Sequence, residues 1–415
     1  MKNNSIAYIQ FPGSNTENET INSLKRCGFS PKPHFWNDPP SLLEDCVGYI
    51  ILGGFSFEDR SRSGIIASLD PVVNKIKEQA LLGKPVLGIC NGAQILVESG
   101  MVPGNKDFNT VLALTDNRRV VKEQIIGTGY YNTWCHIKPN TASNSAFIKK
   151  NGGVLRVPIA HAEGRFVVDK NIEGLVNEKN LITYQYCDHD GEVLKDFPTN
   201  PNSSFKNAAA ISNLSGNVMA MMPHPERSLS GEADDIFESM KEYICSDSSF
   251  SYQSLRYSAK KIKVKPFKHS NKTEVLVSTI IADNEAVSVE RCIKKLGFDV
   301  KIKKYVHYEI SAQKDFDLAA VLKTGVLFNP SKEYISTIKK NKGGFRLLVR
   351  NLDDIHGQSI LQTLQQRFDL KDLQHISKGV VWEININSNS PKKDVDLILN
   401  SHIFSNPVSQ VCHEY

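Results

Sequence analysis

Residues 85–94 read Pro-Val-Leu-Gly-Ile-Cys-Asn-Gly-Ala-Gln, an apolar run that meets a helix-forming segment through the pattern Gly-x-Cys-x-Gly. This pattern is typical of a nucleophile elbow, here with cysteine where serine is common. Such a turn strains the backbone of the nucleophile, and Gly88 and Gly92 lack the side chains that would keep strand and helix apart. A helix N-terminus behind Cys90 would also favour its thiolate. The pattern therefore predicts a nucleophilic cysteine, with a buried structural cysteine beside a tight turn as the alternative.

Short apolar runs alternate with amphipathic stretches over the first 245 residues. The clearest runs lie at residues 6–11, 49–52 and 86–89. They are typical of strands that helices cover on both faces, so this region predicts an α/β fold built on a mostly parallel sheet. Thr16 and Glu19 follow the first run with the spacing of a capping box. We therefore expect a helix there that reaches about Cys27.

The composition limits the class of protein. A chain of 415 residues is too long for one ordinary core and suggests about two to four domains. Its 50 basic and 45 acidic residues leave a net charge of +5, which does not indicate a nucleic-acid partner. The first apolar run is too short for a signal peptide, and no later run reaches about 18 residues, so we expect a cytoplasmic protein without a membrane partner. The eight cysteines form no Cys-x-x-Cys pair, so neither a metal site nor a disulfide framework is predicted.

The character of the chain changes near Cys245. The stretch that follows is rich in serine and then in lysine, with few large aliphatic residues, and it is typical of a linker. Its lysines are Lys260, Lys261, Lys263, Lys265 and Lys268. A patch that binds anions is the alternative to solvated linker charge. We expect four parts, which are 1–246, a linker at 247–271, and two further units at 272–342 and 343–415.

The last two units are degenerate copies of each other. The matching segments, with their offsets, are 275–277 with 347–349 (72), 305–310 with 379–384 (74), and Asn329-Pro330 with Asn406-Pro407 (77). Growing offsets indicate small loop insertions between equivalent elements. Each copy is predicted to contain strand, helix, strand and a terminal Asn-Pro turn. Because such strands need partners, we expect the copies to pack on one another as a tandem α+β pseudo-dimer.

A thiolate nucleophile needs a group that donates a proton to the leaving group, and histidine with a carboxylate behind it is the standard solution. His224 and Glu226 would point the same way from an extended segment, and the prolines around His224 would fix the local backbone. His161 and Glu163 have the same spacing. Spacing alone does not separate the two pairs.

An oxyanion hole is the remaining requirement of such a site, and backbone amides are its usual source. A glycine pair ends an apolar run at Gly54, so the amides of Gly54 and Phe55 could approach a substrate closely, beside the amide of Asn91. An ordinary strand-to-loop turn is the alternative. Gln94, one helical turn after the nucleophile, is a candidate for substrate binding or for a structural role.

Taken together, these motifs resemble those of the class I (triad) glutamine amidotransferases, and within them the glutaminase subunits of phosphoribosylformylglycinamidine synthase. The resemblance covers about residues 5 to 230. The motifs that carry it are 11–15 (Phe-Pro-Gly-Ser-Asn), 53–56 (Gly-Gly-Phe-Ser), the elbow at Cys90, 159–166 (Ile-Ala-His-Ala-Glu-Gly-Arg-Phe), 200–204 (Asn-Pro-Asn-Ser-Ser) and 223–227 (Pro-His-Pro-Glu-Arg). Other triad amidotransferases generally lack the first and fourth of these. The resemblance implies a flavodoxin-like α/β fold.

The family pattern also implies roles for individual residues. It implies a catalytic triad of Cys90, His224 and Glu226. It implies a supporting or interface role for His161, and it leaves the roles of Glu163 and Arg165 open. The departures from the family pattern are Phe57-Glu58-Asp59 in place of Tyr-Gly-Asp, and Ala162 and Ser203 in place of glycine. These departures bear on loop geometry and partner contacts.

The C-terminal copies are similar to the small accessory subunit of the same synthase, which pairs with itself and bridges glutaminase and synthetase. Residues 378–384 and Asn406-Pro407 carry this likeness. No ATP-grasp or P-loop signature is visible, so ATP and Mg²⁺ would be used by a separate large synthetase subunit. The implied reaction converts formylglycinamide ribonucleotide, glutamine and ATP into formylglycinamidine ribonucleotide, glutamate, ADP and phosphate. Alternatives are a cysteine hydrolase or peptidase on the same scaffold and a non-catalytic assembly subunit.

Overall fold

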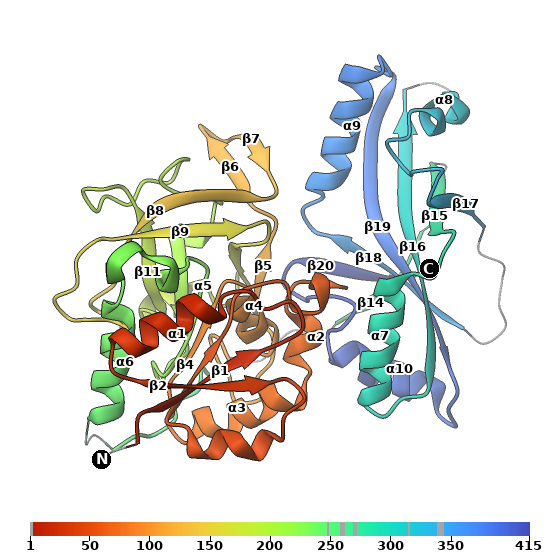
Figure 1. Cartoon of the computed structure of the whole chain (residues 1–415). Helices are drawn as coiled ribbons and strands as arrows, with labels where there is room; N and C mark the ends of the chain where they lie inside the picture. The colour runs from red at the N-terminus through yellow and green to blue at the C-terminus, as the bar shows by residue number, and fades with distance from the viewer. Residues whose placement is uncertain (1–2, 247–248, 258–261, 269–271, 314–315, 338–343) are drawn as a thin grey trace. The chain divides into compact units, whose positions relative to one another are not determined.

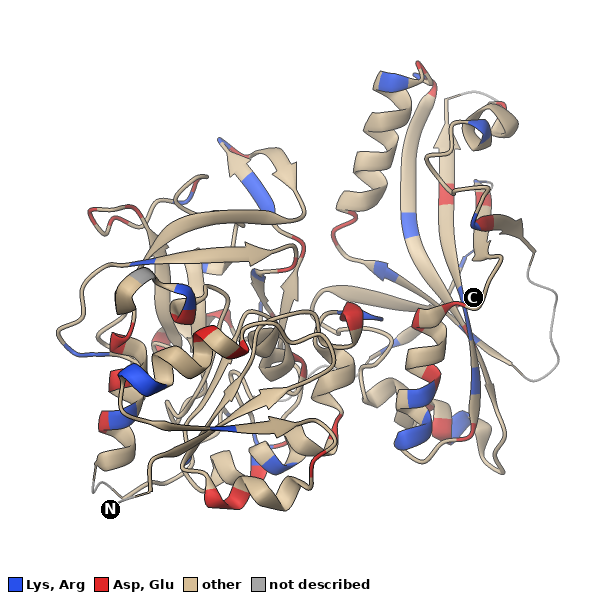
Figure 2. Ribbon diagram, in the orientation of Figure 1, with Lys and Arg blue, Asp and Glu red and all other residues tan. Residues whose placement is uncertain are grey.

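Two compact units make up the chain, Met1–Ala259 and Lys260–Tyr415, and each is described by itself. The computed structural model describes residues 3–246, 249–257, 262–268, 272–313, 316–337 and 344–415. Among the described helices, none reaches the 18 apolar residues that a membrane-spanning helix needs. Figure 2 shows that basic and acidic residues are spread over both units.

A nine-stranded sheet forms the centre of the first unit (Figure 1). Its strands, in spatial order, are β2 (Ser30–Phe35), β1 (Ser5–Gln10), β3 (Gly48–Ile51), β4 (Val86–Ile89), β13 (Val218–Met221), β12 (Ala208–Ser212), β11 (Ile182–Cys187), β8 (Tyr131–Pro139) and β9 (Leu155–His161). The strands from β2 to β13 run parallel, as the alternating pattern predicts. The pairings from β13 to β9 are antiparallel. The prediction of a mostly parallel sheet therefore holds for one half only, because antiparallel neighbours need no crossover helix.

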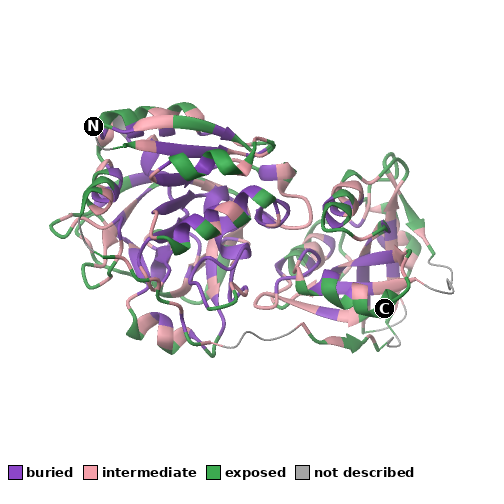
Figure 3. Cartoon of the chain, turned by 90° about the horizontal axis from the view of Figure 1, so that it is seen from below, coloured by how far each residue is buried: buried purple, intermediate pink, exposed green. Residues whose placement is uncertain are grey.

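The described part of the first unit also contains α-helices. They are α1 (Glu17–Arg26), α2 (Ile65–Ser68), α3 (Pro71–Leu81), α4 (Asn91–Glu98), α5 (Glu173–Glu178) and α6 (Asp235–Cys245). The strands β3 and β4 are buried at every position, as strands covered on both faces must be. Figure 3 shows this buried centre and the exposed outer surfaces of the helices. Two small antiparallel sheets, β5 (Leu112–Thr115) with β10 (Arg165–Val168) and β6 (Arg118–Val121) with β7 (Gln124–Thr128), complete the unit.

The helix predicted after the first strand is confirmed as α1, but the capping box predicted for it is wrong. The side chain of Thr16 makes no capping hydrogen bond. Its Oγ1 instead accepts a hydrogen bond from the backbone N–H of Gly53 at 3.1 Å. Glu19 accepts a hydrogen bond from Nε of Arg227 at 3.2 Å. Tertiary contacts have therefore replaced the local ones, and Thr16 ties the first loop to the glycine pair after β3.

The elbow between β4 and α4 is confirmed. Cys90 has φ 51° and ψ −107°, which is unfavourable for a residue with a side chain. A Cβ atom on Gly92 would lie 2.1 Å from the carbonyl oxygen of Ile51, and one on Gly88 would lie 2.4 Å from that of Gly92. Both distances are far below van der Waals contact, so glycine is required for the helix to approach β3 and β4 this closely.

A seven-stranded sheet forms the second unit (Figure 1). Its strands, in spatial order, are β14 (Val264–Pro266), β20 (Gln410–Glu414), β18 (Phe345–Asn351), β19 (Leu373–Ile386), β16 (Val300–Ala312), β15 (Thr273–Thr279) and β17 (Glu333–Ser336). Its helices are α7 (Asn284–Lys295), α8 (Leu318–Lys323), α9 (Ile355–Arg367) and α10 (Pro391–Asn400). The long strands β16 and β19 pair antiparallel at the centre, from Val300 with Ile386 to Ala312 with Leu373.

Equivalent elements follow one another along the second unit, β15-α7-β16-α8-β17 and then β18-α9-β19-α10-β20. The two Asn-Pro turns make the same hydrogen bond. The N–H of Asn329 donates to Oε2 of Glu333 at 2.7 Å, and the N–H of Asn406 donates to Oε1 of Gln410 at 2.9 Å. Each series contains a second helix and a third strand that the sequence pattern did not predict.

Part of the stretch predicted as a linker, 247–271, is packed structure. Leu255 is buried, and its N–H donates to the carbonyl oxygen of Gly104 in the first unit at 3.0 Å. Farther along, β14 pairs with β20 of the second unit. The predicted linker is therefore too long. Lys263, Lys265 and Lys268 are exposed, while Lys260 and Lys261 lie outside the described residues.

Replacing Gly92 by Ala should destabilise the first unit. The added Cβ meets the backbone oxygen of Ile51, which has no freedom to move aside, so we expect a loss of about 1–3 kcal/mol or more in the free energy of unfolding. Urea denaturation measures this change. Gly174→Ala is the matched control, because its Cβ meets nothing within 4 Å. A Gly92→Ala protein as stable as this control would contradict the argument.

Candidate active site

Cys90 is held at the N-terminal end of α4. Its backbone N–H donates to the carbonyl oxygen of Met221 in β13 at 2.8 Å, which ties the elbow to the neighbouring parallel strand. Its Sγ lies 3.9 Å from the carbonyl oxygen of Ala160, near the end of β9. The residue is only 6% exposed. The positive end of a helix favours a nearby anion, so this position suits a thiolate.

His224 and Glu226 form a buried pair beside the elbow. Nδ1 of His224 lies 2.6 Å from Oε1 of Glu226, and the two side chains are 2% and 0% exposed. The backbone N–H of His224 donates to the carbonyl oxygen of Pro158 in β9 at 2.9 Å. The side chains of His224 and Cys90 are also hydrogen-bonded. The structure therefore brings all three members of the predicted triad together.

The surroundings of His224 keep its imidazole protonated. Burial by itself would lower the pKa of His224, but the charges of Glu226 and Cys90 outweigh burial and raise the pKa to about 10. A protonated imidazole in contact with the nucleophile can donate a proton to a leaving group. Glu226 also holds the tautomer and the orientation of the ring.

His161 has a different partner, which separates the two candidate pairs that spacing left open. Its Nδ1 lies 3.2 Å from Oδ1 of Asn117, while Nδ2 of Asn117 donates to the carbonyl oxygen of His161 at 2.6 Å. Burial, together with the charge of His224, lowers the pKa of His161 to about 3, so its ring is neutral. A neutral imidazole bound to an amide suits a supporting role. Arg165 of the same motif donates from Nε to the carbonyl oxygen of Asp116 at 3.1 Å.

The expected oxyanion hole needs one correction. The backbone N–H of Phe55 donates to the carbonyl oxygen of Gly13 at 2.9 Å, so this amide is not available to a substrate. A Cβ atom on Gly54 would lie 2.3 Å from the same oxygen of Gly13, and one on Gly13 would lie 2.2 Å from the carbonyl oxygen of Phe55. Glycine is therefore needed at both positions where the two loops meet. The amide of Asn91 remains a candidate, because the first N–H groups of a helix lack partners within the helix. The amide of Gly54 remains one because it donates no backbone hydrogen bond within the described residues.

Gln94 uses its side-chain amide to join two parts of the site. Its Oε1 accepts from Nδ2 of Asn91 at 2.9 Å, and its Nε2 donates to the carbonyl oxygen of Glu163 at 2.7 Å. The side chain therefore holds the turn after β9 against the elbow helix. These contacts favour the structural role that the sequence left open for Gln94.

Sequence reasoning missed Asn117, which organises the same turn. Its side chain is completely buried. Besides its bonds to His161, its Oδ1 accepts from the N–H of Gly164 at 3.0 Å, and its own N–H donates to the carbonyl oxygen of Ala162 at 2.8 Å. Because Asn117 lies 44 residues before His161, no local pattern could link the two.

The geometry supports acyl transfer from a carboxamide. The arrangement suits Cys90 to act as a nucleophile and His224 as a proton donor, with the amides of Gly54 and Asn91 as candidates for the oxyanion hole. Among the described residues no group of three or more His, Cys, Asp and Glu side chains is arranged to bind a metal ion.

The matching family and the PurQ relatives agree with this chemistry. Residues 3–256 match the family described as "CobB/CobQ-like glutamine amidotransferase domain". The chain is 42% identical over 258 residues to phosphoribosylformylglycinamidine synthase subunit PurQ of Methanothrix thermoacetophila, covering 58% of this chain and 97% of the relative. It is 35% identical to the PurQ subunit of Pyrococcus furiosus, covering 58% and 98%. The PurLQS structure from Thermotoga maritima is 28% identical with a TM-score of 0.46, covering 59% of this chain and 100% of that one.

Replacing Glu226 by Gln should lower the pKa of His224. The substitution removes a charge that opposes burial, so the pKa should fall from about 10 towards or below the ordinary value of 6.5. An NMR titration of the His224 ring measures this shift. In the wild-type protein the folded-state pKa is raised, so protonated His224 stabilises the fold fully below pH 6.5, and this contribution is lost as the pH rises to about 10. Glu226→Gln should weaken that dependence.

Glu19→Gln is the matched control for this titration. Glu19 contacts Arg227 and not the imidazole. The control should leave the His224 titration unchanged. An equally unchanged titration in Glu226→Gln would refute the assignment of Glu226 as the partner of His224.

Proposed function

The chain belongs to the CobB/CobQ-like glutamine amidotransferase domain family, and we propose that it is the glutaminase component of phosphoribosylformylglycinamidine synthase. The similarity to PurQ subunits carries this proposal, since 97% of the Methanothrix relative is covered at 42% identity. The contact between Cys90 and the buried pair His224 and Glu226 supports it, because a glutaminase needs a nucleophile and a proton donor.

In the proposed mechanism the Cys90 thiolate attacks the carboxamide carbon of glutamine. The new carbon–sulfur bond places negative charge on the carboxamide oxygen, and the amides of Gly54 and Asn91 stabilise that charge. His224 donates its proton to the nitrogen as the carbon–nitrogen bond breaks, so neutral ammonia leaves and a glutamyl thioester remains.

Hydrolysis of the thioester completes the cycle. Once Cys90 is acylated it no longer carries the negative charge that helps to raise the pKa of His224, so the imidazole becomes a better proton acceptor. His224 removes a proton from water, which attacks the thioester. The proton stays on His224, which is again an imidazolium. The carbon–sulfur bond then breaks, which regenerates the thiolate, and the new carboxyl group loses its proton to solvent as glutamate leaves.

A separate large synthetase subunit is the proposed acceptor of the ammonia. It would use ATP and Mg²⁺ to convert formylglycinamide ribonucleotide into formylglycinamidine ribonucleotide, a step of purine biosynthesis. The description of the relatives as subunits supports a partner of this kind. We also propose a cytoplasmic location. None of the eight cysteines, all of which lie within the described residues, forms a disulfide bond, as is usual in a reducing compartment.

We propose that the second unit is a tandem of two accessory-subunit-like repeats, residues 272–342 and 343–415, which contacts the synthetase. The equal order of elements in the two halves supports a duplication. The matching hydrogen bonds of Asn329 and Asn406 support it independently, because nothing in an unrelated pair of turns would require the same bond to the fourth residue after asparagine.

Replacing Cys90 by Ala should lower ammonia release from glutamine by at least about a thousandfold, because the chemical step loses its nucleophile. The assay uses the full chain with its synthetase. Free ammonium salt should still support product formation. Cys245→Ala, which changes an exposed cysteine, is the control and should keep wild-type activity. Undiminished ammonia release from Cys90→Ala would refute the proposed function.

The partner can be identified by a pull-down from cell extract with the full chain as bait. Mass spectrometry should find a bound ATP-dependent synthetase. A preparation that releases ammonia from glutamine but binds no synthetase would contradict the assignment to this synthase while leaving the glutaminase activity in place.

A further inference from the structure

A loop beside the elbow carries a carboxyl group that the proposed mechanism does not use. Oδ1 of Asp59 accepts a hydrogen bond from Nδ2 of Asn91 at 3.2 Å. Asn91 follows Cys90 directly in the sequence. The Asp59 carboxyl group therefore contacts the residue next to the nucleophile. The loop holds Phe57, Glu58 and Asp59 at φ 52°, 57° and 53°. Residues with side chains keep such conformations only where their surroundings enforce them.

A second carboxyl group, that of Glu163, belongs to the same cluster. The side chain of Ser63 is hydrogen-bonded to both carboxyl groups, and both keep part of their surface exposed. Burial, followed by the charge of Glu163, raises the pKa of Asp59 to about 7. Burial also raises the pKa of Glu163. Two carboxyl groups in such surroundings are stabilised by a cation placed beside them.

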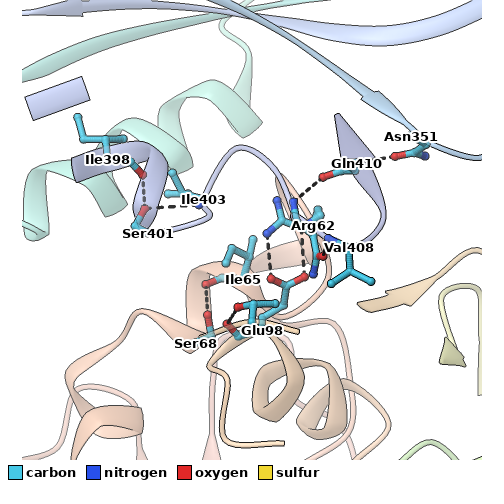
Figure 4. Close-up of polar contacts among 12 residues, drawn as sticks. Arg62, Ile65, Ser68, Glu98, Asn351, Ile398, Ser401, Ile403, Val408 and Gln410 are labelled. Carbon is cyan, nitrogen blue, oxygen red and sulfur yellow. Dashed lines mark hydrogen bonds and ion pairs between the residues drawn. The ribbon is translucent and has the colours of Figure 1, made fainter. Parts of the chain in front are cut away.

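The guanidinium of Arg62 lies in the same region, but it pairs with the carboxylate of Glu98. Its Nε and one terminal nitrogen lie 3.1 Å and 2.9 Å from the two oxygens of Glu98, as Figure 4 shows. This two-bond geometry matches a guanidinium to a single carboxylate. The charge of Arg62 offsets the effect of burial on the pKa of Glu163 only in part. Asp59 and Glu163 therefore still favour an additional cation.

The hydroxyl of Ser56 is an independent sign of a ligand beside Asn91. The backbone N–H of Ser56 donates to Oδ1 of Asn91 at 3.0 Å, which places this residue at the elbow. Ser56 is 3% exposed, and its Oγ has no hydrogen-bond partner within the described part of the chain. A buried hydroxyl without a partner is unfavourable, so a ligand group that forms a hydrogen bond with it is expected there, and an ammonium group can donate one.

We infer that Asp59, with Glu163 and the Ser56 hydroxyl beside it, binds the α-ammonium group of glutamine and so selects a free amino acid over other carboxamides. The inference rests on the proposed glutaminase function, because it needs the carboxamide to lie at Cys90. Four bonds join the carboxamide carbon of glutamine to its ammonium nitrogen. The carboxylate that binds the ammonium group must therefore lie close to the nucleophile. Asn91 holds Asp59 at such a position.

The test compares glutamine with glutaramate, which has the same carboxamide and carboxylate but no amino group. The full-length wild-type chain, assayed with its synthetase, should release ammonia from glutamine with kcat/KM at least about 100-fold above that for glutaramate. Asp59→Asn should lower kcat/KM for glutamine about 100-fold and leave that for glutaramate within about threefold, because only glutamine loses a partner. Glu163→Gln should also lower the ratio of kcat/KM for glutamine to kcat/KM for glutaramate.

Glu58→Gln is the matched control. Glu58 is the neighbouring carboxylate, 76% exposed and paired with Arg60 at 2.7 Å, so its substitution should keep the wild-type ratio. An unchanged ratio in Asp59→Asn, or an equal loss with both substrates in a folded protein, overturns the inference. If thermal unfolding shows that Asp59→Asn does not fold, the ratio in Glu163→Gln decides by the same criterion. Wild-type enzyme that releases no ammonia from glutamine would instead overturn the proposed function, and the inference with it.

Discussion

The close backbone contact between α4 and β3 is the constraint on which the site depends. Gly92 lies so near the carbonyl oxygen of Ile51 that a single added carbon would overlap it. This contact sets the first turn of α4 directly behind Cys90 and forces the cysteine into its strained backbone conformation. The same turn places Asn91, whose side chain then joins Ser56, Asp59 and Gln94. The close packing of the helix on the strands therefore fixes the positions of the residues around Cys90.

Two buried histidines show that the neighbours of a buried imidazole decide whether its pKa is lowered or raised. Burial lowers the pKa of both His161 and His224. His161 has a neutral amide and not a carboxylate at its Nδ1, so burial, together with the charge of His224, lowers its pKa to about 3. His224 has Glu226 and Cys90, and its pKa rises to about 10. The protein therefore keeps one ring neutral and its neighbour protonated within one small region, and each state suits the role of its residue.

Contacts between distant loops hold this region in place. Thr16 binds the glycine pair after β3, and Asn117 binds the turn after β9. Gln94 then links that turn to the elbow helix. Each of these side chains bonds to backbone groups of another segment, so the catalytic geometry depends on the assembled sheet rather than on any one loop. In the second unit, the pairing of the long strands β16 and β19 joins two equivalent series of elements.

The sequence by itself determined the features that local chemistry encodes. The elbow, the parallel half of the sheet and the repeated Asn-Pro turns follow from residue types at short spacings, because glycine, proline and apolar periodicity act within a few residues. Only the tertiary structure decided the rest. The choice of His224 over His161 depended on Asn117 and Cys90, the loss of Phe55 from the oxyanion hole on Gly13, and the packing of residue 255 on Gly104. The antiparallel half of the sheet likewise depended on which strands meet in space. In each case the deciding partner lies many residues away in the sequence. The spacing of residues within a local motif cannot reveal such a partner.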